Sequence, residues 1–170
     1  MIHVESCGLV DYQEAHRRQL ERVGRLQTSE EEERRLVLQH PSVITLGRNG
    51  SSRHIGVSQE FLAARNIDVV RVERGGEATY HGPGQLVCYP VVNLKRRGLS
   101  VIEFVGLLES IMQSVTRKFG IEARADSHNR GIYVGDHKIG SIGIAVKRGI
   151  SFHGLALNVD LDLTPFSWIN

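Results

Sequence analysis

The chain has 170 residues, of which 41% are hydrophobic and 24% charged, with 18 glycines and a formal net charge of +2. This balance is typical of a soluble α/β protein and excludes a disordered or fibrous chain, and no apolar stretch approaches the roughly 20 residues that cross a bilayer. The N-terminus also lacks the basic-then-apolar order of a signal peptide, so we expect a cytoplasmic protein. We expect one domain, with Cys7 and Cys88 as free thiols.

The first half of the chain predicts short strands and two helices. Pro41 lies between two apolar runs, and because proline has no amide hydrogen it separates them into two strands. Asp11 and Ser58 are residue types that cap helices. We therefore expect strands at residues 2–6, on both sides of Pro41, at 67–72 and at 85–94, helices from Asp11 to about Leu26 and from Ser58 to Ala64, and a charged connection at 28–35.

The second half predicts a long helix followed by a strand meander. Ser100 and Glu103 form a capping box, and apolar residues then recur at helical spacing until Gly120. Residues 131–160 predict three strands joined by turns at Gly135-Asp136 and Arg148-Gly149. The fold class is therefore α/β, a mixed α+β sheet with flanking helices. Residues 163–170 are apolar without a closing element, and we expect further residues to follow.

The glycine-rich segment RGGEATYHGPG, residues 74–84, is the first candidate site. It matches neither G-x-x-x-x-G-K-[ST] nor G-x-G-x-x-G, so no usual nucleotide-binding spacing is present. Its glycines fit the tight turns of a structural loop equally well. Against that reading, it concentrates donors in a connecting loop, where sites are commonly built: Arg74, Thr79, Tyr80 and His81.

Lys138 is the second candidate, because the neighbouring Gly140 and Gly143 remove side chains from strand positions that favour large ones. Most lysines in turns only make the protein surface more soluble. Cys88 lies in an apolar run and, like Cys7, is expected to be structural rather than reactive. His40, His81 and His153 have ordinary structural explanations. Without H-E-x-x-H or C-x-x-C spacing we expect no metal centre.

Two basic clusters bear on partners. The first, Arg17 to Arg25, lies on the polar side of a predicted helix and indicates a solvated face. The second, Lys95, Arg96 and Arg97, becomes a possible dock for an acidic partner if the fold brings Lys147 and Arg148 beside it.

Four segments, residues 40–48, 74–90, 131–146 and 151–170, resemble the octanoyltransferase family of lipoate biosynthesis and protein lipoylation. The resemblance implies the catalytic-domain fold of biotin and lipoate protein ligases. It implies transfer of an octanoyl group from octanoyl-acyl carrier protein to a lysine of lipoyl domains, in 2-oxoacid dehydrogenase complexes and in the glycine cleavage H protein. It implies no cofactor, no nucleic acid and no membrane.

The resemblance also implies roles for particular residues. Lys138 is the catalytic lysine, which lowers the pKa of a nucleophilic cysteine. The implied substrate-binding residues are Arg74, Gly75, Gly76, Glu77, Ala78, Thr79, Tyr80, His81, Ser141, Ile142, Gly143, Gly154, Leu155 and Ala156. The missing side chains of the glycines are expected to leave a groove for the alkyl chain.

The nucleophilic cysteine itself belongs to a Pro-Cys-Gly motif that the resemblance places two positions past Asn170. Residues 1–170 are therefore expected to be a single acyltransferase catalytic domain that lacks its C-terminal segment, and to be inactive as they stand. Two alternatives stay open: a non-catalytic acyl- or carrier-binding homologue, and an ATP-dependent lipoate or biotin ligase.

Overall fold

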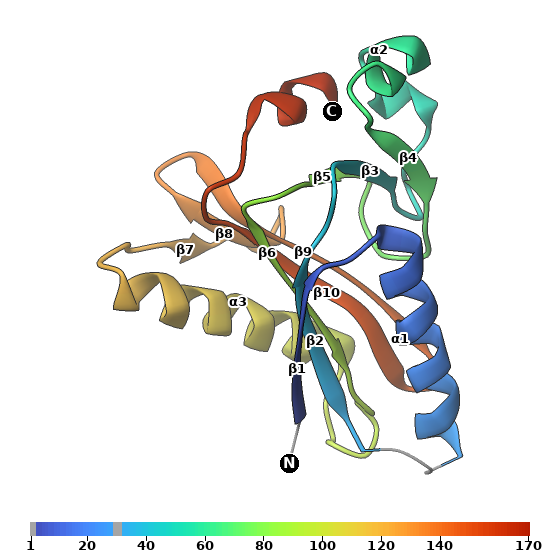
Figure 1. Cartoon of the computed structure of the whole chain (residues 1–170). Coiled ribbons are helices and arrows are strands. Elements are labelled where there is room, and N and C mark those ends of the chain that lie inside the picture. Colours follow the sequence, from blue (N-terminus) through green and yellow to red (C-terminus); the bar gives the residue numbers. More distant parts are fainter. Residues whose placement is uncertain (1–2, 29–31) are drawn as a thin grey trace.

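The computed structural model describes residues 3–28 and 32–170, which form two β-sheets with helices packed around them (Figure 1). The large sheet has seven strands, in the spatial order β1 (His3–Leu9), β2 (Arg34–Gln39), β6 (Gln85–Val91), β10 (Ile150–Asn158), β9 (His137–Lys147), β8 (Gly131–Val134) and β7 (Arg124–Ala125). The small sheet is β4 (Asp68–Arg71), β3 (Val43–Leu46) and β5 (Ala78–His81). The helices are α1 (Tyr12–Gln27), α2 (Gln59–Ala63), α3 (Val101–Lys118) and the 3-10 turns η1 (Ser52–His54) and η2 (Thr164–Trp168).

The helices α1 and α3 cover opposite faces of the large sheet, because side chains alternate along each strand. On β10, Phe152 packs in the core beneath α1, whereas Leu155 packs with Phe104 and Leu108 of α3. Mixed parallel and antiparallel pairing completes the predicted α/β class, since β1 runs parallel to β2 while β6, β8, β9 and β10 pair antiparallel.

The predicted helix starts are confirmed by their capping contacts. The Asp11 carboxylate accepts hydrogen bonds from the backbone N–H groups of Gln13 and Glu14. Ser100 and Glu103 form the reciprocal capping box of α3. The predicted apolar stripe of α3 is too wide, however: Ile111 is 50% exposed and Phe119 78%.

The predicted strand meander is confirmed as β8, β9 and β10, joined at both predicted turns. Three expectations are wrong. Part of the predicted glycine loop is strand β5, which pairs with β3. The predicted connection at 28–35 ends earlier, because β2 begins at Arg34. The C-terminal segment, expected to lack a closing element, has one in η2 and in a bridge between Ile169 and Ile55, and its apolar residues pack onto the small sheet. Residues 2 and 29–31 lie outside the described residues.

The centre of the large sheet contains an irregularity that matters for the site. The ladder between β6 and β10 runs over Gln85–Cys88 and Leu155–Asn158 and stops before Pro90, which has no N–H to donate. Beyond this break His153 adopts a left-handed backbone conformation with φ +56°. Gly154 follows it, and a Cβ there would lie 2.1 Å from the Cys88 carbonyl oxygen. Only glycine allows the two backbones to approach so closely.

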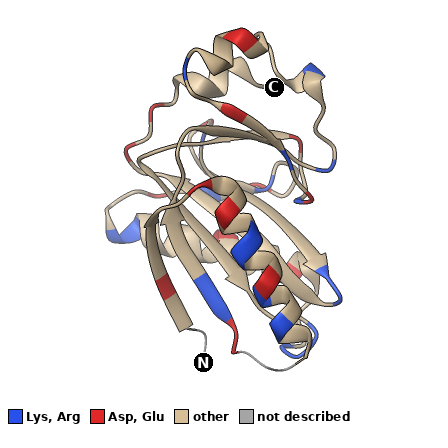
Figure 2. Cartoon of the chain, turned by 45° about the vertical axis from the view of Figure 1, so that its right-hand side comes forward, with Lys and Arg blue, Asp and Glu red and all other residues tan. Residues whose placement is uncertain are grey.

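The first basic cluster is a solvated, ion-paired helix face, as expected (Figure 2). Arg17 and Arg18 both bind the Glu14 carboxylate, and Arg22 reaches Glu5 on β1. In the part of the chain that the structure describes, no helix is both long and apolar enough to cross a membrane.

Candidate functional site

A cleft of about 710 Å³ opens where the glycine loop meets β9 and β10. The N-terminus of α3 and the last residues of the chain complete its walls through Val101, Val105, Ile169 and Asn170. Every sequence-predicted site residue except Tyr80 lines this cleft: Arg74, Gly75, Gly76, Glu77, Ala78, Thr79, His81, Lys138, Ser141, Ile142, Gly143, Gly154, Leu155 and Ala156. Tertiary structure thus brings predicted residues from three separate sequence segments, 74–81, 138–143 and 154–156, to one place.

Tyr80 points away from the cleft, because successive side chains of β5 face opposite sides. Its ring is 3% exposed and packs edge-on against Phe166 of η2, and its hydroxyl hydrogen-bonds with the Ser42 hydroxyl at 3.0 Å. The structure therefore gives Tyr80 a packing role in the small sheet, apart from the cleft that its neighbours line.

The buried Arg74 side chain holds the glycine loop in place through hydrogen bonds. Its guanidinium donates to the Thr45 hydroxyl and carbonyl, at 2.8 and 2.6 Å, and to the carbonyls of Gly75 and Glu77, at 2.9 and 3.1 Å. Burial lowers the pKa of this guanidinium from its usual value. Because these donors bind the protein's own backbone, Arg74 shapes the cleft and supplies positive charge to it.

The expected role of the glycines is wrong in part, because several of their vacant Cβ positions are already filled by neighbours. A Cβ on Gly143 would lie 2.9 Å from Arg74 Cδ, and one on Gly140 would lie 2.8 Å from the Met112 sulfur. Gly154 faces the Cys88 carbonyl as described above. These glycines allow loop, strand and helix to approach each other closely. Gly75 differs, because its nearest such atom is 3.7 Å away.

Lys138 reaches the cleft from β9, beside the bulge where β8 and β9 shift register. Its Nζ donates to Asn129 Oδ1 at 2.7 Å and lies 5.5 Å from the centre of the Tyr133 ring. Gly131 makes room for it, since a Cβ there would lie 2.7 Å from Lys138 Cε. Burial lowers the pKa of the ammonium, against the opposing effect of Asp126 and Glu109. The amine is therefore held in place and loses its proton more readily than an exposed lysine.

His81 lies deeper in the cleft as a neutral imidazole. Gln85 Nε2 donates to Asn158 Oδ1 and to the Tyr80 carbonyl, so its Oε1 faces His81 and accepts from Nδ1–H at 2.7 Å. Burial lowers the pKa of His81 to about 3. The ring therefore presents an uncharged face to the cleft.

Several residues of the cleft were missed by sequence reasoning. Tyr12 and His153 contribute from α1 and β10, and Asn129 holds the lysine from the segment before β8. Tyr12 was visible only as one member of a helical apolar stripe. His153 follows Phe152 in an apolar run, and no local signal distinguishes it from a buried structural histidine.

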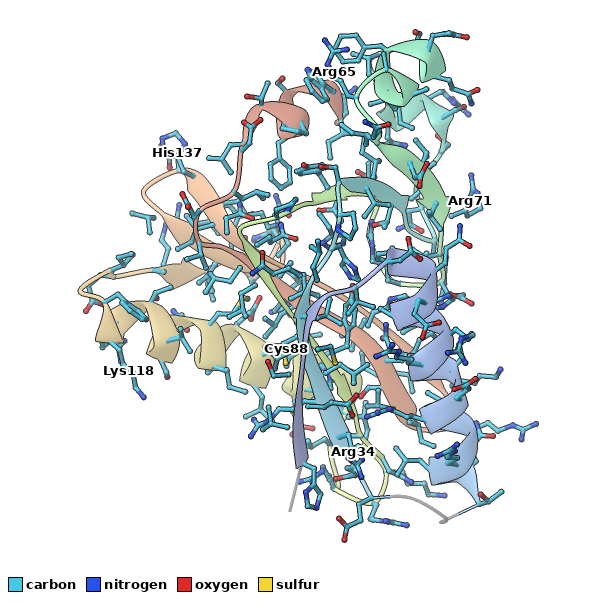
Figure 3. The ribbon with its side chains drawn as sticks, in the orientation of Figure 1. Arg34, Arg65, Arg71, Cys88, Lys118 and His137 are labelled. Atoms are coloured by element: carbon cyan, nitrogen blue, oxygen red, sulfur yellow. The ribbon has the colours of Figure 1, made fainter. Side chains whose placement is uncertain are left out.

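Neither cysteine has the surroundings of a reactive thiol. Burial raises the pKa of Cys88 to about 11, and Figure 3 places it in the body of the large sheet on β6. Burial also raises the pKa of Cys7, and the nearby Glu5 carboxylate adds to this effect. A thiol must ionise to attack, so both remain structural, as expected.

Comparisons with known proteins agree with this geometry. Residues 11–170 match the family model of the lipoyl protein ligase A/B catalytic domain. An octanoyltransferase of Desulfotalea psychrophila is 52% identical over 137 residues, covering 79% of this chain and 61% of the relative. An octanoyltransferase of Ectopseudomonas mendocina is 46% identical over 171 residues, covering 98% of this chain and 78% of the relative. The chain thus spans about three-fifths of the first relative's length.

The fold is also found among solved structures. A putative lipoate protein ligase from T. acidophilum, solved with bound lipoic acid, superposes with a TM-score of 0.74 at 18% identity, over 98% of this chain and 72% of that one. At that identity the likeness shows the fold alone, and it confirms the expected ligase-like architecture. With the family model and the relatives, it shows that the chain belongs to the octanoyltransferase family, within the lipoyl protein ligase A/B catalytic domains.

Proposed function

We propose that the cleft is the acyl site of an octanoyltransferase, which takes an octanoyl group from octanoyl-acyl carrier protein and passes it to a lysine of a lipoyl domain. The observation that carries the proposal is the position of Lys138, a partly buried amine at a cleft that also has an apolar wall. The family membership of the chain supports the same reaction.

The apolar wall suits a straight alkyl chain. Ile142 and Ile144 come from β9, Leu155 from β10 and Val105 from α3, and all of them line the cleft. Each methylene removed from water contributes about 0.8 kcal/mol, so the length of the wall converts chain length into affinity. We propose that the acyl tail lies along this wall with its carbonyl toward Lys138.

In the first half-reaction a cysteine thiolate attacks the thioester carbonyl, the C–S bond to the carrier breaks, and the leaving carrier thiolate takes a proton from the Lys138 ammonium, which leaves Lys138 neutral. The thioester is already activated, so the step needs no ATP. We propose that the Lys138 ammonium holds the attacking thiolate in its ionised form. Arg74, which also lines the cleft, adds positive charge to it.

In the second half-reaction the acceptor lysine amine attacks the acyl-enzyme, an amide bond forms, and the cysteine leaves as a thiolate. The attacking amine must first be neutral and then lose a second proton. We propose that Lys138 accepts a proton here, because burial lowers the pKa of its ammonium. Asn129 keeps the Nζ in position through the 2.7 Å hydrogen bond.

The attacking thiol is neither Cys7 nor Cys88, for the reasons of burial given above. We propose that it lies two positions past Asn170, as the family resemblance implies, and Asn170 itself lines the cleft. This arrangement supports a nucleophile that enters the site directly after the C-terminal bridge between Ile169 and Ile55.

The predicted docking site for an acidic partner at Lys95, Arg96 and Arg97 has less support. The fold does bring the second cluster beside Gly149, where Leu94 N–H donates to the Gly149 carbonyl. Arg97, however, is paired with the buried Glu33 carboxylate. The cluster also lies at the far end of β9 from Lys138, about 30 Å along the strand at ~3.3 Å per residue. This distance favours a plain solvated surface over a docking site for the carrier.

The test uses protein translated from the whole reading frame, incubated with octanoyl-acyl carrier protein and a lipoyl domain. Mass spectrometry follows the octanoyl adduct on the enzyme and then on the acceptor lysine. Lys138→Met should slow transfer by about 100-fold or more, as expected for loss of a general acid–base group. Lys147→Met removes an exposed lysine from the far end of the same strand and should leave the rate unchanged.

Three results would contradict the proposal. ATP consumption on addition of free octanoate or lipoate would identify a ligase. Saturable acyl binding without an adduct on any cysteine would identify a non-catalytic binding protein. A Lys138→Met enzyme with an undiminished rate would remove the lysine from the mechanism.

A further inference from the structure

Three potential metal ligands converge beside the cleft, and neither the proposed transfer reaction nor the family assignment gives them a role. His16 lies on α1, Glu73 precedes the glycine loop, and His153 lies on β10. Glu73 Oε2 is 3.0 Å from His16 Nε2 and 3.7 Å from His153 Nε2. Within the described residues, the three ligand atoms lie within 4.8 Å of one another.

Neither imidazole makes a hydrogen bond through the atom that faces the cluster, although both Nε2 atoms lie within ion-pair distance of the Glu73 carboxylate. The Nε2 atoms of His16 and His153 are buried and make no hydrogen bond. The His153 side chain is 1% exposed, so water does not replace the missing partner from the bulk. A buried polar atom without a partner is costly and calls for an ion or an ordered water. Both nitrogens lack a hydrogen bond, and both lie beside the same carboxylate.

The two rings also lie next to each other. The His16 and His153 rings stack with centroids 5.2 Å apart and planes 15° from parallel. Neutral imidazole is the form that binds metals. The backbone N–H of His153 donates to Gln19 Oε1 at 2.6 Å, which fixes the histidine against α1 despite its left-handed φ of +56°.

We propose that His16, Glu73 and His153 form a binding site for a zinc ion. Tetrahedral zinc with bonds of about 2.0–2.2 Å places its ligand atoms about 3.4 Å apart, and the two distances from Glu73 to the histidines bracket that value. Two imidazoles and one carboxylate are ligands that zinc accepts. Glu73 is 52% exposed, so a fourth position opens toward solvent and takes a water molecule.

A second group supports the required tautomer. The Tyr12 hydroxyl lies 3.4 Å from His153 Nδ1. With the metal on Nε2, Nδ1 carries the proton and donates a hydrogen bond to the Tyr12 oxygen, at the place that a carboxylate, a carbonyl or water usually takes beside a zinc-bound histidine. Arg74 follows Glu73 in the chain, and its positive charge weakens the site, so one carboxylate gives moderate rather than extreme affinity.

The ion would tie three elements together: α1, β10 and the residue that precedes Arg74. Because His153 also lines the cleft, zinc would stiffen one wall of the proposed acyl site without contacting the acyl group. No sequence spacing shows this site, since its ligands come from three separate elements. The proposal rests on the cluster alone and does not depend on the transferase reaction.

The experiment titrates the metal-free chain with Zn²⁺ at pH 7.5 in competition with a chromogenic chelator, and with Co²⁺ by visible spectroscopy. We expect one zinc per chain, a raised Tm, and cobalt bands of tetrahedral intensity without a thiolate charge-transfer band. His16→Ala and Glu73→Gln should each weaken binding by about 30-fold or more. Glu73 is half exposed, so its variant keeps the fold, which circular dichroism checks.

The matched control is His54→Ala. His54 Nε2 lies 3.8 Å from Glu77 Oε1, a pair of the same residue types without a second histidine, so its removal should leave zinc affinity unchanged. The proposal is overturned by any of three results: no saturable binding below about 100 μM zinc, equal binding by the His16→Ala chain, or a thiolate band that assigns the metal to Cys7 or Cys88.

Discussion

Different interactions stabilise the large sheet, the small sheet and the contact between them. The cleft lies where the two sheets meet. The large sheet buries apolar side chains on both faces, under α1 on one side and α3 on the other. The small sheet has a core around Ile44 and Tyr80, covered by α2 and η2, and a smaller cluster in which Val43 and Val72 pack with Tyr12 of α1. The join between them depends on Arg74 and on glycines that admit close backbone contact.

This comparison indicates at which positions a substitution should change the stability of the protein most. In the large sheet apolar burial is repeated over many residues, so most single changes are partly compensated. At the join each contact is specific and has no substitute. The following predictions are ordered by expected effect and ask whether this distinction holds.

The largest effect is expected where two central strands of the large sheet depend on a close approach of their backbones. Gly154→Ala puts a Cβ 2.1 Å from the Cys88 carbonyl oxygen and forces β6 and β10 apart. The free energy of unfolding should fall by about 4 kcal/mol in urea denaturation. Gly106→Ala is the control, because this glycine of α3 has no atom near its Cβ position, and alanine there should stabilise by about 0.5–1 kcal/mol.

The second prediction tests the join. Arg74→Met leaves the carbonyls of Thr45, Gly75 and Glu77 without their donor and should cost about 3 kcal/mol. Amide hydrogen exchange should accelerate in β5 and the glycine loop and stay slow in β10. Arg71→Met, an exposed arginine on β4 that Figure 3 labels, should change neither. Equal acceleration in both sheets would show that they open as one unit.

The third prediction concerns pH and two buried histidines near the join. Burial lowers the pKa of His40 to about 4 and of His81 to about 3, whereas the unfolded chain protonates near 6.5. Between these values the unfolded state binds more protons, so stability falls as the pH falls through that window. By pH 5 each histidine should cost about 2 kcal/mol.

Urea denaturation at pH 7.5, 6.5 and 5.5 measures this dependence. His40→Gln should flatten the curve, because it removes one of the titrating groups. His128→Gln, at a side chain that is 97% exposed, should leave the slope unchanged. A stability that stays constant from pH 7.5 to 5.5 would contradict the prediction.

The smallest effect is expected on the outer side of the small sheet. The Arg65 guanidinium lies 3.6 Å from the centre of the Phe61 ring and 5.7 Å from that of Trp168, and so links α2 to η2. Arg65→Ala should cost about 0.5–1 kcal/mol, because the contact is exposed to solvent. Arg53→Ala, exposed on η1, is the comparison and should be neutral. An Arg65 effect larger than that of Arg74 would reverse the proposed difference.

Most secondary structure of the large sheet could be predicted because its signals are local. Asp11, Ser100 and Gly120 mark helix ends by side-chain chemistry or backbone freedom, and the turn pairs before and after β9 separate three strands. The small sheet was harder. Strand β5 has the glycines and proline of a loop on both sides, and it becomes a strand only because β3 offers it a partner.

The candidate site divides in the same way. Lys138 and the glycine loop were identifiable from residue types and from the family resemblance. Three features depend on neighbours that are distant in sequence. They are the direction in which Tyr80 points, the hydrogen bonds by which Arg74 supports the glycine loop, and the hydrogen bond between Asn129 and Lys138. The cluster of His16, Glu73 and His153 had no sequence signal at all.

The amino-acid order alone determined the helix caps, the turns, the alternating strands and the family of this protein, because each is encoded by residues close together or by a long run of matching types. Only the tertiary structure decided which glycine spaces stay open, which way each loop side chain faces, and how far the pKa of each buried group moves. Those properties arise from exclusion of water and from contacts between segments distant along the chain, and no local pattern contains them.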